Sequence, residues 1–323
     1  MGKNESATIC HIFDCREFAL VDRTVFLSKF IRSLSGITKP FLAEASDGHI
    51  YVVKGESDAC ISSMLFNEAA GTILYHTIGL ATPAWKPIVV TESFVQTMVK
   101  AAPEHFGNNG VRPGLAFGSQ FLGESGRTLL EILSGTQFIH VRNRRSLWLS
   151  WLVDICASHS DNRQIVFLRD EVRRLIATFI DHGHMFGGPE WNRDPHFVAC
   201  RYLDARIYAD ISAEELNALI SDIARIETDA MWDRFASIPE EWKFPSGIRA
   251  CANCLNRLQN TTLVRSIADK AFQALELSKR HERVEYLTSD ASAAEILHPI
   301  LLQNGARRGR PVPCEAYCDR IVR

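Results

Sequence analysis

The fold is decided by two apolar runs, each with an acid at its outer end: Ser158-His-Ser-Asp-Asn-Arg-Gln-Ile-Val-Phe-Leu168 and Phe179-Ile-Asp-His-Gly183. Between them, Arg169-Asp-Glu-Val-Arg-Arg174 has the composition of a turn. β-prone runs on either side of a turn are typical of a hairpin. The pattern therefore predicts a β-hairpin that carries Asp161 just before its first strand and Asp181 at the end of its second.

Two acids placed in this way suit phosphoryl transfer. Enzymes of that class use one carboxylate to orient the attacking hydroxyl and another to hold Mg²⁺ against the phosphates of ATP. Asp161 is the candidate for the first role and Asp181 for the second. The alternative is two solvated loop acids, so the interpretation depends on matching residues elsewhere in the chain.

The matching residues begin with a second hairpin upstream. Phe41-Leu-Ala-Glu-Ala45 and Ile50-Tyr-Val-Val-Lys54 lie on either side of Ser46-Asp-Gly48, and an Asp-Gly turn between β-prone runs predicts a hairpin. Just before it, Ser33-Leu-Ser-Gly-Ile-Thr38 contains the candidate phosphate ligands. These would be the backbone N–H groups and hydroxyls of Ser35, Gly36 and Thr38, although a plain turn is the alternative.

Residues 58–78 then change to a helical period. Apolar side chains recur every three or four residues, which predicts an amphipathic helix with Ser57 or Asp58 as its N-cap. Glu68 falls on the apolar side of this helix, where a carboxylate is costly unless it is paired. We therefore predict an ion pair with Lys54, which would hold that ammonium toward nucleotide phosphates. The alternative is that both side chains reach water.

The remainder of the chain is mostly helical. Leu129, Leu130 and Leu133 predict a short helix, and helical periods continue over 213–235 and 246–279. The predicted class is α+β, with a strand-rich N-terminal lobe containing one main helix and a mostly helical C-terminal lobe. Its expected parts are the N-terminal lobe at 1–114, a hinge at 115–126, the helical lobe with the catalytic hairpin at 127–302, and a loosely held tail at 303–323.

Composition limits the classes of partner. Of the 323 residues, 46% are hydrophobic and 23% charged, as in a globular protein, and the net charge of −2 gives no overall field for nucleic acid or an anionic membrane. No stretch is apolar over the length of a membrane span, and the N-terminus lacks the apolar core of a signal peptide. Nine scattered cysteines indicate free thiols in a reducing cytoplasm.

Two metal sites are alternatives to Mg²⁺. Cys251 and Cys254, together with Cys314 and Cys318, have the thiols for a four-thiolate zinc site, although small buried side chains explain them as well. His182 and His184 lie beside Asp181 in sequence, and with His159 as a third ligand these residues predict, as a further alternative, a zinc- or iron-dependent hydrolase.

The ordered motifs resemble those of the HipA-like kinases. Lys39-Pro-Phe-Leu42, the run from Gly48 to Gly55, and Phe66-Asn-Glu-Ala-Ala70 resemble the N-terminal lobe of that family. The runs around Asp161 and Asp181 resemble its catalytic and metal-binding segments. Ile238-Pro-Glu-Glu-Trp242 resembles its C-terminal helical part, so that the likeness extends over about residues 30–280.

The resemblance implies an ATP- and Mg²⁺-dependent kinase with a protein-kinase-like fold. Lys54 would bind phosphates, Glu68 would position Lys54, Asp161 would act as the catalytic acid-base residue and Asp181 would bind Mg²⁺. The strand from Phe117 to Phe121 would border the adenine, with Gln120 and Phe121 as its contacts. Better-known relatives phosphorylate a protein Ser or Thr, and some are toxins restrained by a DNA-binding antitoxin. A protein substrate or a small-molecule acceptor, and an antitoxin-like or other regulatory protein, are the implied partners.

One departure from the family is visible. HipA-like kinases usually have an Asn five residues after the catalytic Asp, as a second metal ligand, and here that position is Val166. Asn162 and Gln164 are the candidate substitutes from a shorter loop. The alternative is a non-catalytic nucleotide-binding pseudokinase or interaction module.

Overall fold

The computed structural model describes residues 24–107, 110–123, 129–133, 137–169, 174–194, 200–202, 204–208, 211–273 and 275. The predicted tail at 303–323, and with it Cys314 and Cys318, lies outside the described residues.

A five-stranded antiparallel sheet forms the N-terminal part. Its strands lie in the order β1 (Leu27–Ser33), β2 (Phe41–Ala45), β3 (Ile50–Lys54), β5 (Gly114–Gln120) and β4 (Trp85–Val90). The predicted hairpin is present as β2 and β3, in which Phe41 pairs with Val53 and Glu44 with Ile50. Gly48 turns the chain between them at φ +82°, a conformation that glycine adopts without steric cost.

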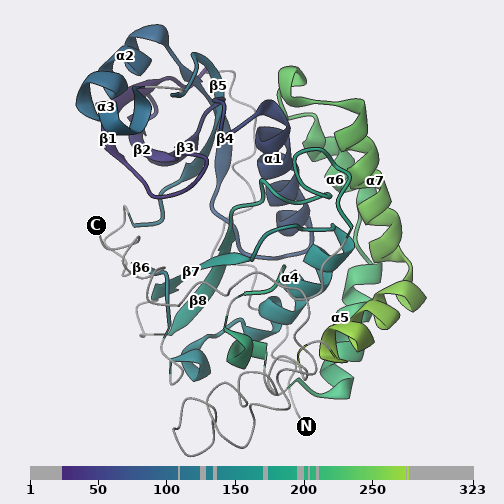
Figure 1. Cartoon of the computed structure of the whole chain (residues 1–323). Coiled ribbons are helices and arrows are strands. Elements are labelled where there is room, and N and C mark those ends of the chain that lie inside the picture. Colours follow the sequence, from purple (N-terminus) through teal and green to yellow (C-terminus); the bar gives the residue numbers. More distant parts are fainter. Residues whose placement is uncertain are drawn as a thin grey trace, which may run out of the picture.

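The two edges of this sheet meet, so that it curls into a small barrel. Phe26 forms a bridge to Val89, and the N–H of Val89 donates to the carbonyl of Val25 at 2.8 Å. Helices α2 (Glu92–Ala101) and α3 (Pro103–Phe106) cover the barrel and share its core, as Figure 1 shows. Closure in this way leaves little open strand edge.

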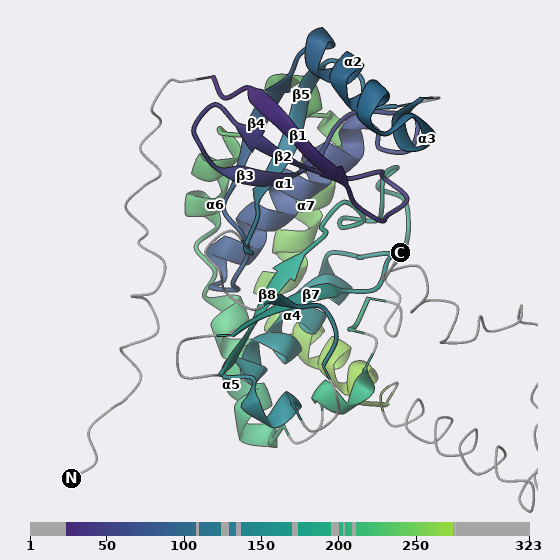
Figure 2. The ribbon, with the colours of Figure 1, turned by 90° about the vertical axis from the view of Figure 1, so that its left-hand side faces the viewer.

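Helix α1 (Ser62–Thr77) lies between this barrel and the helices of the C-terminal part (Figures 1 and 2). Thirteen of its 16 residues are buried, so it is a central element and not a surface helix. The predicted N-cap at Ser57 or Asp58 is wrong. The Ser57 hydroxyl instead accepts the N–H groups of Ala59 and Cys60 in a turn that precedes the helix.

The predicted hairpin of the two acids forms most of a second sheet. Strand β7 (Gln164–Arg169) pairs antiparallel with β8 (Leu175–Ile180), and β6 (Leu129–Leu130) pairs with β7. The predicted short helix at Leu129 to Leu133 is therefore wrong. Three leucines suit a helix or a strand equally well, and pairing with the apolar β7 decides for the strand.

Helices complete the C-terminal part. They are α4 (Arg144–Cys156), α5 (Ala213–Ala224), α6 (Thr228–Phe235) and α7 (Pro245–Gln259), with short 3₁₀ turns at Phe138–His140, Ala205–Tyr208 and Glu240–Trp242 and a further helix at 261–273. The two-lobed α+β class is confirmed. Residues 115–126, expected as the hinge, begin with β5, which lies inside the first sheet. No helix among the described residues has both the length and the apolarity that crossing a membrane requires.

Candidate active site

The centre of the candidate site is the ammonium of Lys54, at the end of β3. Its Nζ donates to Glu68 Oε1 at 2.5 Å and to Asp181 Oδ1 at 2.7 Å. The predicted ion pair between Lys54 and Glu68 is therefore present, and Asp181 joins it from the end of β8. A strand, a helix and a hairpin that are far apart in sequence thus converge on one cation.

Burial and charge work against each other in this trio. Burial acts to lower the pKa of Lys54, but the charges of Asp181 and Glu68 outweigh it and hold that pKa well above its usual range. Burial acts to raise the pKa of Asp181, and the Lys54 ammonium outweighs it and holds that pKa well below the usual value. Burial raises the pKa of Glu68, which the lysine only partly offsets. Lys54 and Asp181 are therefore both charged at neutral pH.

Helix α1 is fixed to the segment that follows Asp181 by two adjacent side chains. Glu68 Oε2 accepts the N–H of His182 at 2.9 Å. The fully buried amide of Asn67 donates to the carbonyls of Gly183, Met185 and Gly188 at 3.0, 3.0 and 3.2 Å, and it accepts from Trp191 Nε1 at 2.8 Å. The sequence interpretation missed Asn67. Its only signal was a second polar residue beside Glu68 on an apolar helix, where a buried amide needs partners.

Asp161 lies in a different environment. Its carboxylate is exposed, and its Oδ1 accepts the backbone N–H of Asn162 at 2.7 Å. Two of the predicted metal residues, Asp181 and Gln164, lie side by side. Gln164 Nε2 donates to Asp181 Oδ2 at 2.7 Å. Val166, at the position usual for Asn, is buried in β7.

The residues around Asp181 fit Mg²⁺ better than zinc or iron. Mg²⁺ takes hard oxygen ligands, usually one or two carboxylates together with substrate phosphates, and the Asp181 carboxylate and the Gln164 amide oxygen are of this kind. Within the described ranges, no three His, Cys, Asp or Glu side chains gather as a metal-binding group. The Nδ1 atoms of His159 and His182 both face the guanidinium of Arg163, which can only donate, so these lone pairs are already engaged. The structure thus offers no support for the alternative His-based metal site.

The zinc alternative built on cysteines also finds little support. Cys251 and Cys254 are fully buried in α7, and burial raises the pKa of both thiols well above the usual value. A zinc ligand must be a thiolate, whereas these two side chains behave as small buried hydrophobes.

The predicted nucleotide contacts lie at two places on the barrel. Ser35, Gly36 and Thr38 form the turn between β1 and β2, where the Lys39 N–H donates to the Gly36 carbonyl at 3.1 Å. Ser35 and Gly36 are exposed there. Gln120 and Phe121 lie at the other end of β3 from Lys54.

The strand register gives the distance between the adenine candidates and the lysine. Lys54 pairs with Phe117, while Tyr51 pairs with Gln120. Three residues along a strand span about 10 Å, so Gln120 lies about that far along the sheet from the level of Lys54.

Backbone strain collects around the same segments. Five described residues other than glycine have a left-handed backbone. Lys39 (φ +49°) follows the turn of Ser35 to Thr38, and the other four lie near the Asp161 and Asp181 segments: Ser158 (φ +50°), Asp181 (+60°), Phe186 (+59°) and Trp191 (+53°). Such conformations persist only where the surroundings impose them, and they concentrate at functional sites. Asp181 is itself one of the four.

A protein-family model described as HipA-like kinase matches residues 28–273, which is most of the chain. The chain belongs to the HipA-like kinase family. This confirms the resemblance that the motifs indicated, over nearly the same range. No curated protein matches the sequence.

Two solved structures are similar to this HipA-like kinase. The proinflammatory kinase CtkA of Helicobacter pylori matches with a TM-score of 0.50 and 10% identity, covering 78% of this chain and 99% of that one. The Golgi casein kinase with Mn/ADP bound matches with a TM-score of 0.44 and 13% identity, covering 78% of this chain and 73% of that one. The likeness to CtkA shows a protein-kinase-like fold, and family membership makes this a kinase-type phosphotransferase at that level of description.

Proposed function

We propose that this chain is an ATP- and Mg²⁺-dependent kinase that phosphorylates a Ser or Thr hydroxyl of a protein. The observation that carries the proposal is the Lys54 ammonium shared between Glu68 and Asp181. A lysine held by a helix carboxylate, next to a metal-binding aspartate, is the arrangement that positions ATP for phosphoryl transfer in kinases.

Each charged group has a defined task in this reaction. Lys54, oriented by Glu68, binds the phosphates of ATP. Asp181 and Gln164 would hold Mg²⁺, which would supply positive charge against the phosphate oxygens. Asp161 is exposed, so it can orient the incoming hydroxyl and accept its proton. The new O–P bond then forms as the γ-phosphoryl group leaves ADP, which takes the bonding electron pair.

Gln164 is the proposed replacement for the metal-binding Asn that the family usually has at the position of Val166. Its side-chain amide lies 2.7 Å from Asp181 Oδ2 through Nε2. Rotation of that amide by half a turn presents Oε1 in place of Nε2, and an amide oxygen is a suitable Mg²⁺ ligand. This contact supports an active kinase. The presence of Val166 at the usual Asn position is the observation that favours a pseudokinase instead.

The acceptor and the location are parts of the same proposal. We propose a protein Ser or Thr acceptor from family membership, with a small-molecule hydroxyl as the alternative, and a regulatory protein as a further partner. A cytoplasmic location is supported by the free, buried state of the five described cysteines, Cys60, Cys156, Cys200, Cys251 and Cys254.

The test uses the full chain. Incubation with γ-labelled ATP and Mg²⁺, alone and with a broad pool of proteins, should label a Ser or Thr residue of the kinase or of a substrate. Calorimetry with ATP, with and without Mg²⁺, measures binding in parallel. Mg²⁺-dependent binding without any labelling would favour the pseudokinase, and a lack of ATP binding in either condition would overturn the proposal.

A further inference from the structure

We propose that Arg163 is a positioning residue that fixes the backbone of Asp181 relative to the loop of Asp161, and thereby sets the affinity of the site for Mg²⁺. The proposal rests on the proposed function for the role of Asp181. Arg163 lies between Asp161 and Gln164 in sequence, yet its side chain is fully buried and pairs with Asp154. An arginine in that place has no access to solvent, and so its contacts are all within the protein.

One half of the guanidinium is anchored in the core. Arg163 Nε donates to Asp154 Oδ2 at 2.8 Å and Nη2 donates to Asp154 Oδ1 at 2.6 Å, which makes a two-point ion pair with helix α4. The Tyr75 hydroxyl of α1 donates to the same carboxylate at 2.7 Å, and the guanidinium lies over the Tyr75 ring at 4.9 Å. Helices α1 and α4 therefore hold Arg163 from two sides.

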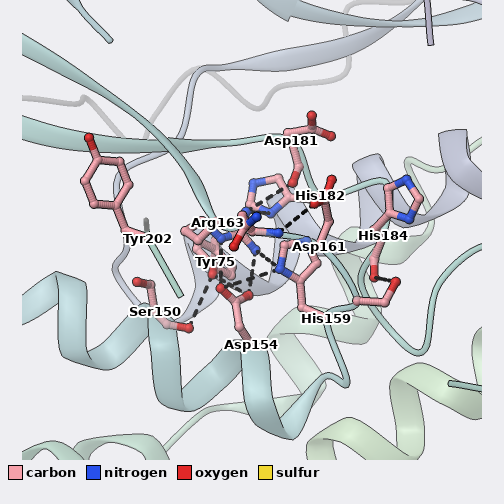
Figure 3. Close-up of polar contacts among 12 residues, drawn as sticks. Tyr75, Ser150, Asp154, His159, Asp161, Arg163, Asp181, His182, His184 and Tyr202 are labelled. Atoms are coloured by element: carbon pink, nitrogen blue, oxygen red, sulfur yellow. Dashed lines mark hydrogen bonds and ion pairs between the residues drawn. The ribbon is translucent and has the colours of Figure 1, made fainter. Parts of the chain in front are cut away.

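The other half reaches the end of β8. Arg163 Nη1 donates to the carbonyl of Ile180 at 2.9 Å and to that of Asp181 at 3.2 Å. Figure 3 shows the Asp181 carboxylate pointing away from the guanidinium, so Arg163 holds the main chain and leaves the carboxylate free for other partners. The Asp181 backbone is left-handed at φ +60°, and a conformation of that kind needs such external support.

Two histidines complete the set of acceptors around the Arg163 guanidinium. Nη1 donates to His182 Nδ1 at 3.2 Å, and Nη2 approaches His159 Nδ1 at 3.5 Å. A guanidinium can only donate, so both Nδ1 atoms act as acceptors of its N–H groups. The five N–H groups of an arginine are all directed at acceptors here, which a lysine with its single ammonium cannot reproduce.

Stability alone does not account for the buried pair. Apolar side chains of similar volume often replace a buried ion pair with no loss of stability, whereas removal of one partner is strongly destabilising. A variant that neutralises both partners therefore separates the fold from the positioning. Asp154→Asn/Arg163→Met removes both charges and keeps an acceptor for the Tyr75 hydroxyl. The wild-type chain is the control, because replacing either partner alone would leave a buried charge unpaired.

Two measurements on the full chain decide the matter. The first is the Mg²⁺ concentration that gives half-maximal binding of ATP, which we expect to rise about 10- to 100-fold in the double variant relative to the control, the range for residues that support a metal ligand. The second is hydrogen exchange of the amides at 180–183. It should speed up in the double variant, while the thermal midpoint and the exchange of β2 and β3 stay as in the control.

The conservative variant Arg163→Lys keeps the charge beside Asp154 and covers the case in which the double variant does not fold. We expect it to keep the thermal midpoint but to show faster exchange at 180–183 and a higher Mg²⁺ concentration for half-maximal ATP binding. Unchanged exchange at 180–183 in the folded variants, or a change spread evenly over the whole chain, would overturn the positioning role. The exchange measurement needs no activity, so a wild-type chain that fails to bind ATP would end the proposed function without deciding this one.

Discussion

The two acids that define the hairpin have opposite surroundings. Asp181 is held at both carboxylate oxygens, by Lys54 and Gln164, and its main-chain carbonyl accepts from Arg163. Asp161 is exposed, with its Oδ1 bonded to the N–H of the next residue. The same residue type, separated by one hairpin, is thus fixed in one place and accessible in the other.

The difference matches the two chemical tasks. A metal-binding carboxylate must be charged and already in place, because each ordering step that metal binding requires lowers the affinity. A residue that orients an incoming hydroxyl must be accessible from solvent, because that hydroxyl belongs to a second molecule. Fixing of Asp181 and exposure of Asp161 are therefore what a kinase needs at these two positions.

The largest effect is expected from comparing Asp181→Asn with Asp161→Asn. In the proposed reaction Asp181→Asn removes the charge that would bind Mg²⁺, so both Mg²⁺-dependent ATP binding and phosphoryl transfer should fall, transfer by roughly 10²- to 10³-fold or more. Asp161→Asn should lower transfer by a similar factor but leave ATP binding within about twofold, since its carboxylate acts on the acceptor. Calorimetry and labelling with γ-labelled ATP measure the two quantities separately.

The exposed aspartate Asp194 provides a control for the loss of one surface charge. Asp194→Asn should change neither quantity. Equal loss of ATP binding in the Asp181 and Asp161 variants would remove the distinction between the two acids.

The next effect concerns the acid that orients the lysine. Glu68→Gln keeps a side-chain acceptor for the His182 N–H but removes one of the two carboxylates that contact the Lys54 ammonium. We expect phosphoryl transfer to fall about 10- to 100-fold, as for other residues that support a ligand, with a smaller change in Mg²⁺ dependence than in Asp181→Asn. A rate equal to that of the wild type would show that Asp181 alone positions Lys54.

Sequence reasoning found the groups whose local pattern was distinctive. Lys54 at a strand end, Glu68 on an apolar helical face and the acids on either side of a hairpin all follow from periods of two and four residues. The pairing of Lys54 with Glu68 also followed, since a buried carboxylate needs a partner.

The same reasoning could not find Arg163 and Asn67. Each is polar, and each lies in a segment where solvent exposure is the ordinary expectation. Their burial depends on how α1, α4 and β8 pack together, and no local period encodes that packing. The start of α1 and the strand at Leu129–Leu130 were mispredicted for a related reason, because tertiary pairing overrides local preference there.

Lowering the pH should reduce the stability that the charged Asp181 carboxylate contributes to the fold. The pKa of Asp181 in the folded chain is depressed below the ordinary 3.8 because Lys54 stabilises its charge more than burial opposes it. Its contribution to stability is therefore fully present above pH 3.8 and is lost as the pH falls from there toward the folded pKa. Urea midpoints between pH 7 and pH 2.5 should consequently fall more steeply below pH 4 in the wild type than in Asp181→Asn. Parallel curves would show that Lys54 does not stabilise the charged form.

The smallest expected effect concerns Gln164, the side chain that joins the two acids' segments. Gln164→Ala removes the bond to Asp181 Oδ2, and in the proposed reaction it also removes an amide oxygen from Mg²⁺. Asp181 keeps its bond to Lys54 and its backbone contact with Arg163, so the folded state should be unaffected. We expect a several-fold rise in the Mg²⁺ concentration for half-maximal activity, with kcat at saturating Mg²⁺ nearly restored, because one neutral ligand of several is lost. Gln164→Glu supplies a charged oxygen at the same length and should lower that Mg²⁺ concentration. If both variants matched the wild type, the second metal ligand would lie elsewhere, and Asn162, the other candidate in the same loop, would be the next to replace.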